Sequence, residues 1–266
     1  MKPIIKWAGG KSRLLSTLKQ FLPKFPGAYF EPFLGGGALA FDLAHEQANL
    51  SDINAELIEF YQIIRDNPED FLSSISLWKN DEQTFYNVRA LDRDINAYKT
   101  LSPIIRAARF YYLNKTCFNG LYRVGKKGFN TPWGHGKNVA INIENILSIS
   151  QYLKRINLKL HGFEMLPMLM KAGDFVYCDP PYVPLNVDDE CFSGYGVSFG
   201  IKEQTQLRDV CIKLREIGTT GMLSNSDTIL TRELYKNFDI KIIEAPRKIS
   251  AKSSNRKNVN EILVLW

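Results

Sequence analysis

The chain has 266 residues, of which 45% are hydrophobic and 23% are charged. This length and apolar content suffice for a full hydrophobic core and for one or two domains. No stretch approaches the roughly 18–20 apolar residues of a membrane span, and the N-terminus lacks a cationic-then-apolar signal pattern, so we expect a soluble cytoplasmic protein without membrane association. The net charge of +6 and the pI near 9.0 favour a polyanionic partner without identifying it.

The cysteines and histidines argue against a metal or disulfide framework. Cys117, Cys178, Cys191 and Cys211 form no C-x-x-C pair, and the three histidines are scattered. Reduced thiols fit a cytoplasmic setting, and no metal is expected.

The first segment with a recognisable pattern is residues 4–11, where Trp7, a Gly-Gly bend and Lys11 precede a helix expected over residues 12–21. An aromatic ring and a lysine at the start of a helix could close over a bound ligand. The G-x-x-x-x-G-K-[ST] spacing is absent, which argues against a phosphate-binding loop.

A strand expected over residues 28–33 runs into a glycine turn at 35–37 and then a helical run. This arrangement lets backbone approach a ligand closely. The turn does not match the spaced G-x-G-x-x-G fingerprint, so a dinucleotide is not the first choice. Asp52 ends a second strand, over 49–52, about twenty residues after the glycines, a spacing that places a carboxylate on ribose hydroxyls. An Asp in this position is also often the N-cap of the next helix.

The strand–helix alternation stops after Asp52 and resumes a hundred residues later. Helical apolar spacing is found in residues 55–66, 68–79, 81–89 and 102–113. Residues 114–138 are rich in Gly, Asn, Lys and aromatics, which predicts a β-hairpin or an ordered loop. Sheet-type patterns return at 158–161, 174–178, 219–223, 240–245 and 261–266, with a helix expected at 202–217. A helical insertion with a hairpin therefore interrupts an α/β domain.

The tetrapeptide Asp179-Pro180-Pro181-Tyr182 follows the strand at 174–178. Two prolines cannot continue a sheet ladder, so the chain leaves the sheet at Asp179, at the edge where open α/β sheets bind ligands. The Asp179 carboxylate and the Pro180 carbonyl could accept from an exocyclic amine, while Tyr182 stacks on its ring. The same residues are also common in plain turns. The upstream glycine turn favours the amine-activating interpretation.

These motifs, taken together, resemble the Dam-type DNA adenine-N6 methyltransferases. The segments that carry the resemblance are Lys6–Lys11 (KWAGGK), Glu31–Gly37 (EPFLGGG), Asp52–Asn54 (DIN), Asn119–Arg123 (NGLYR), Phe129–Gly134 (FNTPWG), Asp179–Tyr182 (DPPY), Leu223–Asp227 (LSNSD) and Ser253–Glu261. They occur in register over nearly the whole chain.

The resemblance implies methyl transfer from S-adenosylmethionine to N6 of an adenine that is flipped out of double-stranded DNA. It implies an α/β fold with a Rossmann-like S-adenosylmethionine-dependent methyltransferase sheet and an inserted, mainly helical DNA-recognition domain carrying a β-hairpin. We expect the catalytic domain at residues 1–56 and 157–266, and the target-recognition domain at 57–156 with its hairpin at 118–138. GATC is the typical target of close relatives, with or without a restriction partner.

The resemblance also assigns site residues. Those expected to bind the cofactor are Trp7, Lys11, Phe33, Gly35, Gly37, Asp52, Phe163 and Asp179, and those expected in catalysis are Asp179, Pro180, Pro181 and Tyr182. Phe163 follows Gly162, where relatives usually carry Asp or Ser, and an ordinary core phenylalanine is an equal alternative. Phe192, Tyr195 and Phe199 could wall the flipped adenine.

The residues expected to contact DNA are Lys6, Phe118, Asn119, Leu121, Arg123 and Pro132. Phe118 would fill the space that the flipped base leaves, and Arg123 could bind a guanine bidentately, worth about 1–3 kcal/mol of discrimination. His135 departs from the Arg or Lys that relatives carry after Pro-x-Gly. The basic residues of the segment 247–257 form a candidate phosphate-binding loop.

Two alternatives stay open at the level of sequence. One is a methyltransferase that acts on RNA, on a protein glutamine amide or on another DNA sequence; Asp rather than Asn at 179 argues against the amide enzymes. The other is a DNA-binding regulator without catalysis, which the complete set of motifs disfavours. No obligate protein partner is inferred.

Overall fold

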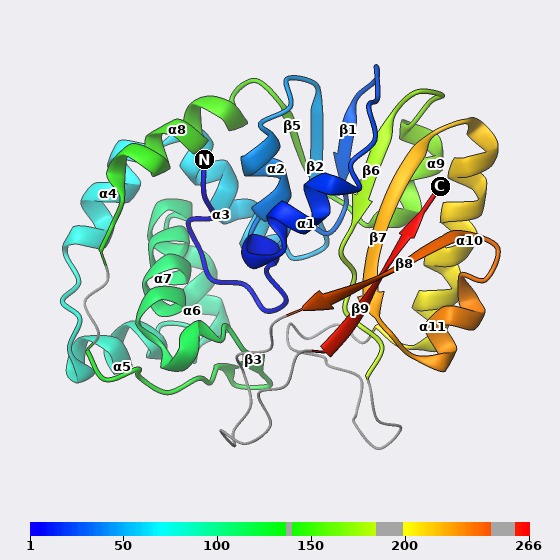
Figure 1. Ribbon diagram of the computed structural model, residues 1–266. Coiled ribbons are helices and arrows are strands. Elements are labelled where there is room, and N and C mark those ends of the chain that lie inside the picture. The colour runs from blue at the N-terminus through cyan, green and yellow to red at the C-terminus, as the bar shows by residue number, and fades with distance from the viewer. Residues whose placement is uncertain (137–139, 185–198, 246–258) are drawn as a thin grey trace.

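A seven-stranded, mostly parallel sheet forms the centre of the protein in the computed structural model (Figure 1). The structure describes residues 1–136, 140–184, 199–245 and 259–266. In spatial order the strands are β5 (Asn157–Leu160), β2 (Ala48–Asp52), β1 (Tyr29–Glu31), β6 (Phe175–Cys178), β7 (Thr220–Ser226), β9 (Val259–Leu265) and β8 (Asp239–Ala245). The first five run parallel, and β9 is antiparallel to both of its neighbours. The expected α/β fold with a mostly parallel sheet is confirmed.

The strand order reverses between β1 and β6. From β1 the sheet continues through β2 and β5, and from β6 it continues the other way through β7. The register pairs Tyr29 with Phe175 and Phe30 with Val176, so the two strands end at the same edge of the sheet. Such a switch point leaves a crevice beyond the carboxyl ends of the strands, where ligands bind in α/β folds.

The central strands are apolar on both faces, as strands covered on both sides must be. Alternate residues point to opposite faces: one face carries Tyr29, Phe175 and Tyr177, and the other carries Phe30, Val176 and Cys178, all nearly inaccessible. Helix α10 (Ile201–Ile217) contributes Leu207 and Leu214 to the second cluster. This double burial explains why residues 174–178 read as a continuous apolar run.

The helices follow the predicted order with several additions. Their bounds are α1 (Leu15–Gln20), α2 (Ala38–Leu43), α3 (Ala55–Asp66), α4 (Pro68–Ser76), α5 (Glu82–Ala90), α6 (Ile95–Thr100), α7 (Pro103–Thr116), α8 (Ile143–Leu153), α9 (Leu166–Leu169) and α11 (Ile229–Leu234), besides α10. Asn54 and Asp81 cap α3 and α5 by accepting from Leu57 N (3.1 Å) and Thr84 N (2.8 Å). None of the helices in these ranges is both long and apolar enough to cross a membrane.

The helical part lies beside the β5 end of the sheet, where α4, α5, α6 and α7 are seen together (Figure 1). Helix α3 packs on β2 and β5 and also on α4, α7 and α8, so one hydrophobic cluster continues from the sheet into the helices. Phe60 of α3, for example, stacks on Tyr111 of α7 with ring centroids 6.1 Å apart. The two parts therefore share a core.

Some sequence predictions were incomplete. The helix expected over 12–21 is divided into η1 (Lys11–Arg13) and α1, and α6, α8, α9 and α11 were not predicted. Helix α8 does show helical spacing at its buried positions, Ile146, Ile149 and Leu153, which was a usable signal. The hairpin expected within 114–138 is confirmed, but its paired part is short: β3 (Val124–Gly125) and β4 (Gly128–Phe129), with a bridge between Cys117 and Trp133. Helix α7 occupies the segment as far as Thr116.

Candidate active site

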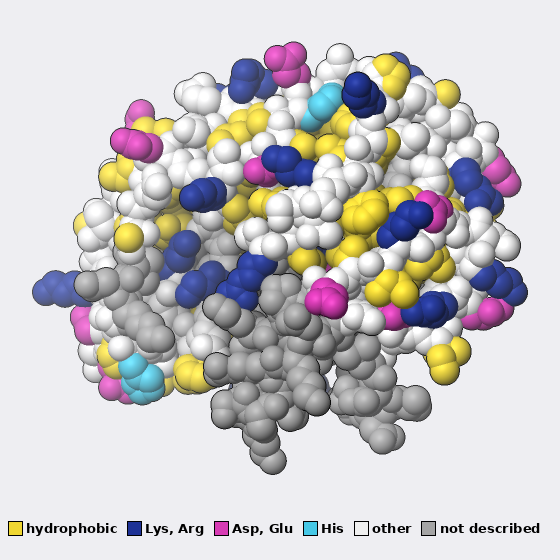
Figure 2. Space-filling view, in the orientation of Figure 1, with side chains coloured by type: hydrophobic (Ala, Val, Ile, Leu, Met, Phe, Trp, Pro, Cys, Tyr) yellow, Lys and Arg dark blue, Asp and Glu magenta, His cyan; other side chains and the backbone are white. Residues whose placement is uncertain are grey.

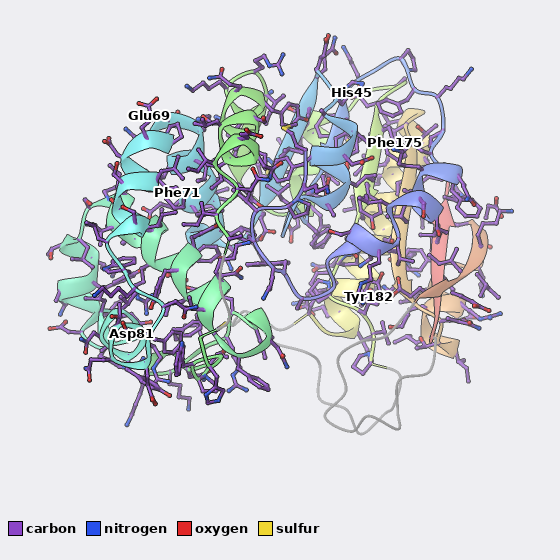
Figure 3. The ribbon with its side chains drawn as sticks, turned by 60° about the vertical axis from the view of Figure 1, so that its left-hand side comes forward. His45, Glu69, Phe71, Asp81, Phe175 and Tyr182 are labelled. Carbon is purple, nitrogen blue, oxygen red and sulfur yellow. The ribbon has the colours of Figure 1, made fainter. Side chains whose placement is uncertain are left out.

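Two loops meet at the switch point of the sheet. The glycine turn follows β1, and Asp179–Tyr182 follow the neighbouring strand β6. Gly35 and Gly37 have φ values of +47° and +65°, in the left-handed region where a side chain causes strain. In Figure 3, Tyr182 lies at the lower end of the sheet and Phe175, at the start of β6, lies near the upper end. Because β1 and β6 are parallel neighbours, the glycine turn and Asp179–Tyr182 lie at the same edge of the sheet.

The indole ring of Trp7 packs on this glycine turn. A Cβ atom added to Gly35 would lie 2.5 Å from Trp7 Cδ1. The backbone at Gly35 therefore lies so close to the indole ring that only glycine fits. The Tyr61 hydroxyl of α3 donates to the Gly35 carbonyl at 3.1 Å and restrains the turn. Trp7 and Gly35, both expected to bind the cofactor, are thus in direct contact, whereas Gly37 lies against Phe41.

Asp52 is oriented toward the same turn. Its Oδ2 accepts from Gly35 N at 3.0 Å, and its Oδ1 accepts from Asn54 N at 2.9 Å. Burial raises the pKa of Asp52, and the backbone N–H donors offset part of that rise. The cap of α3 is Asn54 rather than Asp52, so the alternative reading of Asp52 as an N-cap is wrong. Each carboxylate oxygen keeps further accepting capacity for a ligand hydroxyl.

Three phenylalanines form a cluster beside the turn. Phe33 stacks on Phe163 with ring centroids 5.6 Å apart, and Phe199 meets Phe33 edge-on at 5.8 Å and Phe163 at 6.0 Å. Phe163 is buried, so it is a core residue that also contacts a predicted cofactor residue. Phe199, which was expected to wall the flipped adenine, packs against Phe33 and Phe163, the two phenylalanines expected to bind the cofactor.

Lys11 and Asp179 form a buried ion pair across the switch point. Lys11 Nζ lies 2.6 Å from Asp179 Oδ1 and 2.9 Å from Oδ2, and it also donates to the Gly9 carbonyl at 2.6 Å. Its ammonium is 4.6 Å from the centre of the Tyr182 ring, a cation–π distance. Lys11 therefore orients the carboxylate and the ring at once.

Burial and charge act against each other at this carboxylate. Burial raises the pKa of Asp179, while the charge and hydrogen bonds of Lys11 lower it. The Tyr182 hydroxyl donates to Glu261 Oε2 at 2.8 Å, which fixes the ring from β9. Burial, followed by the charges of Asp179 and Glu261, raises the pKa of Tyr182, so its hydroxyl stays protonated.

Glu31 is a third acidic group here that sequence reasoning missed. It ends β1, is 3% exposed, and accepts from the Tyr29 hydroxyl at 2.5 Å. Burial raises its pKa to about 8; the hydrogen bond from Tyr29 offsets part of the increase, and the charges of Asp179 and Asp52 add to it. Glu31 is therefore neutral near pH 7. An acid at the end of an expected strand, directly before a glycine turn, was the available signal.

The N-terminal segment is tied to the helical part through Lys6. The Asn114 side chain, fully buried in α7, accepts from Lys6 N at 2.8 Å and donates to Lys6 O at 2.6 Å. Two hydrogen bonds from one amide fix the backbone there and leave the Lys6 side chain exposed. Asn114 was not singled out from the sequence, because a buried Asn in a helix has no periodic signature.

Apart from Lys6, the residues expected to contact DNA lie on the surface of the module after α7. Phe118 is 52% exposed, Asn119, Arg123 and Pro132 are exposed, and Leu121 is half-buried. Phe118 N donates to the Pro132 carbonyl at 2.9 Å, and Arg123 Nε donates to Asn130 Oδ1 at 2.7 Å. Beneath them, Tyr122 and Phe129 pack together with ring centroids 4.9 Å apart. An apolar core thus presents a polar and aromatic surface.

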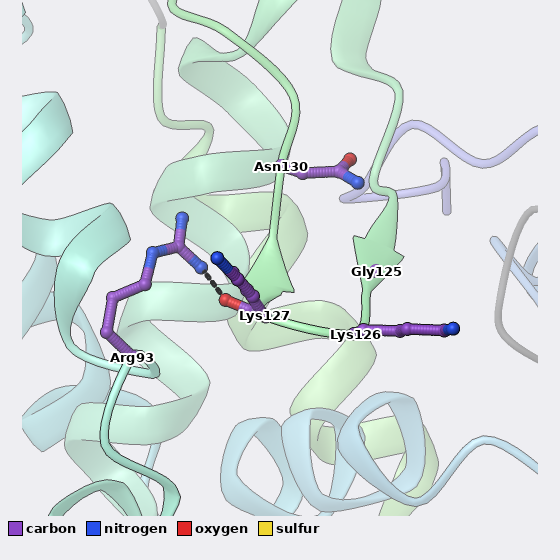
Figure 4. A pocket seen from close by; sticks show the side chains of 6 residues that line it. Arg93, Gly125, Lys126, Lys127 and Asn130 are labelled. Atoms are coloured by element: carbon purple, nitrogen blue, oxygen red, sulfur yellow. Dashed lines mark hydrogen bonds between the residues drawn. The ribbon is translucent and has the colours of Figure 1, made fainter.

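Two cavities occur in this module. One, of about 340 Å³, is lined by Lys6, Lys115, Thr116, Cys117, Phe118, Asn119, Gly134 and His135. Burial and the charge of Lys6 lower the pKa of Lys115 to about 8. The other, of about 390 Å³, is lined by Arg93 and the hairpin tip (Figure 4). Lys and Arg side chains also gather beside the grey atoms in Figure 2. The first cavity brings Lys6, Phe118 and Asn119 together.

The hairpin is anchored by the loop before α6. Asp92 Oδ2 accepts from Phe129 N at 2.6 Å and pairs with the fully buried Arg109 at 2.7 Å. Arg93 donates to the Phe129 carbonyl at 2.7 Å and to the Lys127 carbonyl, the contact drawn in Figure 4. These anchoring residues were not predicted.

Several residues considered in the sequence lie outside the described ranges: Phe192, Tyr195, Cys191 and the basic segment 247–257. Within the described ranges, no group of three or more His, Cys, Asp or Glu could hold a metal ion. Cys117, Cys178 and Cys211 are free and buried.

Known proteins resemble the chain along its full length. The family described as D12 class N6 adenine-specific DNA methyltransferase matches residues 7–249. The Type II methyltransferase M1.LlaDCHI of Lactococcus lactis subsp. cremoris is 42% identical, over 99% of this chain and 95% of the relative. The Type II methyltransferase M.MjaIII of Methanocaldococcus jannaschii is 35% identical, over 100% and 99%. A DNA adenine methylase of Escherichia coli K12 is 31% identical, over 100% and 95%.

Among solved structures, a putative RNA methyltransferase from Pyrococcus horikoshii aligns with a TM-score of 0.39 at 9% identity, over 97% of this chain and 82% of that chain. Nothing about function follows from a likeness at that level. The family match and the relatives are sufficient, and this chain belongs to the D12 class of N6 adenine-specific DNA methyltransferases.

Proposed function

We propose that this enzyme methylates N6 of an adenine that it flips out of double-stranded DNA, with S-adenosylmethionine as methyl donor and GATC as target. The observation that carries the proposal is the meeting of the Lys11-paired Asp179 and the glycine turn at one switch point. Flipping is required because an N6 amine held in a base pair cannot reach a site inside the protein.

The residues beside β1 and β2 suit the donor. When bound, S-adenosylmethionine supplies an electrophilic methyl group on a cationic sulfonium. Trp7 and Phe33 offer aromatic faces to a cation, and the turn of Gly35–Gly37 carries no side chains that would block a close approach. Asp52, held by Gly35 N, presents carboxylate oxygens to ribose hydroxyls.

The residues after β6 bind and activate the adenine. The Asp179 carboxylate and the Pro180 carbonyl each accept one N–H of the N6 amine, and Tyr182 stacks on the ring. The negative carboxylate stabilises the positive charge that develops on N6 as the new N–C bond forms. Lys11 acts through Asp179: its charge lowers the pKa of the carboxylate against the effect of burial, and its ammonium orients the group, while each oxygen retains a lone pair for the amine.

We assign target recognition to residues 57–156, and catalysis and donor binding to 1–56 and 157–266. Support comes from the exposed side chains over the Tyr122 and Phe129 core, and from Asn114, which links Lys6 to this part. In this assignment Phe118 fills the gap left by the flipped base, and Asn119, Leu121, Arg123, Pro132 and Lys6 reach base edges.

The target is tested by methyl transfer in vitro. Tritium from labelled S-adenosylmethionine should enter duplex DNA that contains GATC, but not the same duplex with one base of the site changed, nor structured RNA. Transfer to the altered duplex at an equal rate contradicts the GATC assignment, and preferential transfer to RNA contradicts the DNA assignment. Sequencing of methylated positions after expression in a methylation-free host then gives the target directly.

A further inference from the structure

We propose that Gln204 and Asn225 are positioning residues for the catalytic loop, whose backbone they hold on both sides of Tyr182. This inference rests on the proposed function, because it assumes that Asp179–Tyr182 bind the target adenine. Gln204 is 1% exposed on α10, and Asn225 is 0% exposed on β7. Neither touches the predicted donor residues or the DNA-reading module through any hydrogen bond between described residues.

The two side-chain amides form a chain of hydrogen bonds that begins and ends on the loop. Gln204 Nε2 donates to the Pro181 carbonyl at 2.8 Å, and Asn225 Nδ2 donates to Gln204 Oε1 at 3.0 Å. Asn225 Oδ1 accepts from Val183 N at 3.1 Å. Pro181 and Val183 flank Tyr182, so the ring is held by its backbone on either side.

Backbone donors determine the orientation of both amides. Asn225 Oδ1 accepts from Val183 N and also from Ser226 N at 2.9 Å, so the atom there must be oxygen. The Asn225 nitrogen then faces Gln204. Gln204 must therefore accept with its side-chain oxygen, and its own nitrogen donates to the Pro181 carbonyl. Reversal of either amide would place two acceptors or two donors together in a buried site. The chain therefore has one direction.

The loop Asp179–Val183 needs support from side chains because its prolines cannot donate the backbone hydrogen bonds of a sheet. Pro180 and Pro181 have no N–H, so the residues after β6 cannot join a sheet ladder. Tyr182 is restrained by Glu261 and Lys11 through its side chain only. Gln204 and Asn225 supply the missing backbone partners, and displacement of reacting groups by about 1 Å can cost about 100-fold in rate.

The test compares three variants by kcat, KM for DNA, KM for S-adenosylmethionine and Tm. Gln204→Leu removes the donor to Pro181 and should lower kcat by about 10- to 100-fold, with KM for the methyl donor changed by less than about twofold. Gln206→Leu makes the same change two residues further along α10, at an exposed position, and should leave kcat unchanged.

Gln204→Glu keeps the shape of the side chain and separates positioning from folding. An ionised carboxylate repels the Pro181 carbonyl, whereas a protonated one donates to it. The kcat of this variant relative to the wild type should therefore rise as the pH falls from about 8 to about 6. Two results would overturn the inference. One is a kcat for Gln204→Leu equal to that of the wild type, measured at a temperature well below the Tm of the variant. The other is a ratio of Gln204→Glu kcat to wild-type kcat that does not change with pH.

Asp179→Ala in the same assay distinguishes the two levels of the argument. If Asp179→Ala retains turnover, the proposed adenine site is itself wrong. If Asp179→Ala loses turnover and Gln204→Leu keeps it, the catalytic site stands and only the positioning role fails.

Discussion

Removal of the ion pair between Lys11 and Asp179 should affect stability and turnover differently. The two side chains are 5% and 18% exposed, and their charged atoms are 2.6 Å apart. Asp179→Ala leaves the Lys11 ammonium buried without its partner, and breaking a buried pair in this way costs about 3–5 kcal/mol. For a chain of this size, that corresponds to a fall in Tm of roughly 6–20 °C.

The double variant Lys11→Met/Asp179→Asn removes both charges and nearly preserves both volumes. Replacement of a buried ion pair by neutral groups is often close to neutral for stability, so its Tm should return toward that of the wild type. Turnover should nevertheless stay about 10²–10³-fold below the wild type, because the carboxylate that stabilises charge on N6 is absent. In the proposed mechanism, Lys11 acts on the reaction through that carboxylate and through the Tyr182 ring.

Thermal unfolding and single-turnover methyl transfer measure the two effects. Lys19→Met is a matched control, because Lys19 pairs with Asp42 at 2.9 Å but is 51% exposed, and it should change stability by no more than about 1 kcal/mol. Recovery of turnover together with stability in the double variant would refute the catalytic role and leave Asp179 as a structural partner of Lys11.

Three further predictions follow from the site. Gly35→Ala should raise KM for S-adenosylmethionine and lower Tm, because its φ is +47° and its Cβ would lie 2.5 Å from Trp7, whereas Gly36→Ala, with its nearest contact at 3.4 Å, should leave Tm unchanged. The folded state holds a proton on Glu31 up to about pH 8 that the unfolded chain releases near 4.5, so the free energy of unfolding falls as pH rises through this window. Glu31→Gln should remove about 1.4 kcal/mol per pH unit from the slope of that free energy against pH, measured by denaturant unfolding. An unchanged slope would show that the Glu31 carboxyl is ionised in the folded state. Arg123→Met should reduce discrimination between GATC and a singly altered site by about 5- to 150-fold, and an equal loss of methylation on both sites would rule out base reading.

Much of the fold was readable from the sequence, because its signals are local. Apolar runs predicted the strands, and the prolines of Asp179–Tyr182 and the glycines of 35–37 marked where two of them end. Tight turns and the loss of N–H donors depend on residue type alone. The short paired part of the hairpin and helices α6, α8 and α11 were less predictable, since brief or mixed patterns compete with their surroundings.

The contacts that make these motifs a site could be known only from the tertiary structure. Lys11 reaches Asp179 across 168 positions, Asn114 holds Lys6 across 108, and Gln204 holds Pro181 across 23. No periodicity links such residues, because the order of the strands and the packing of the helices determine which of them meet. The neutral state of Glu31 likewise depends on burial, which is a property of the folded chain. The sequence alone determined which groups are present at each strand end, and the placement of β1 beside β6 decided which of them act together.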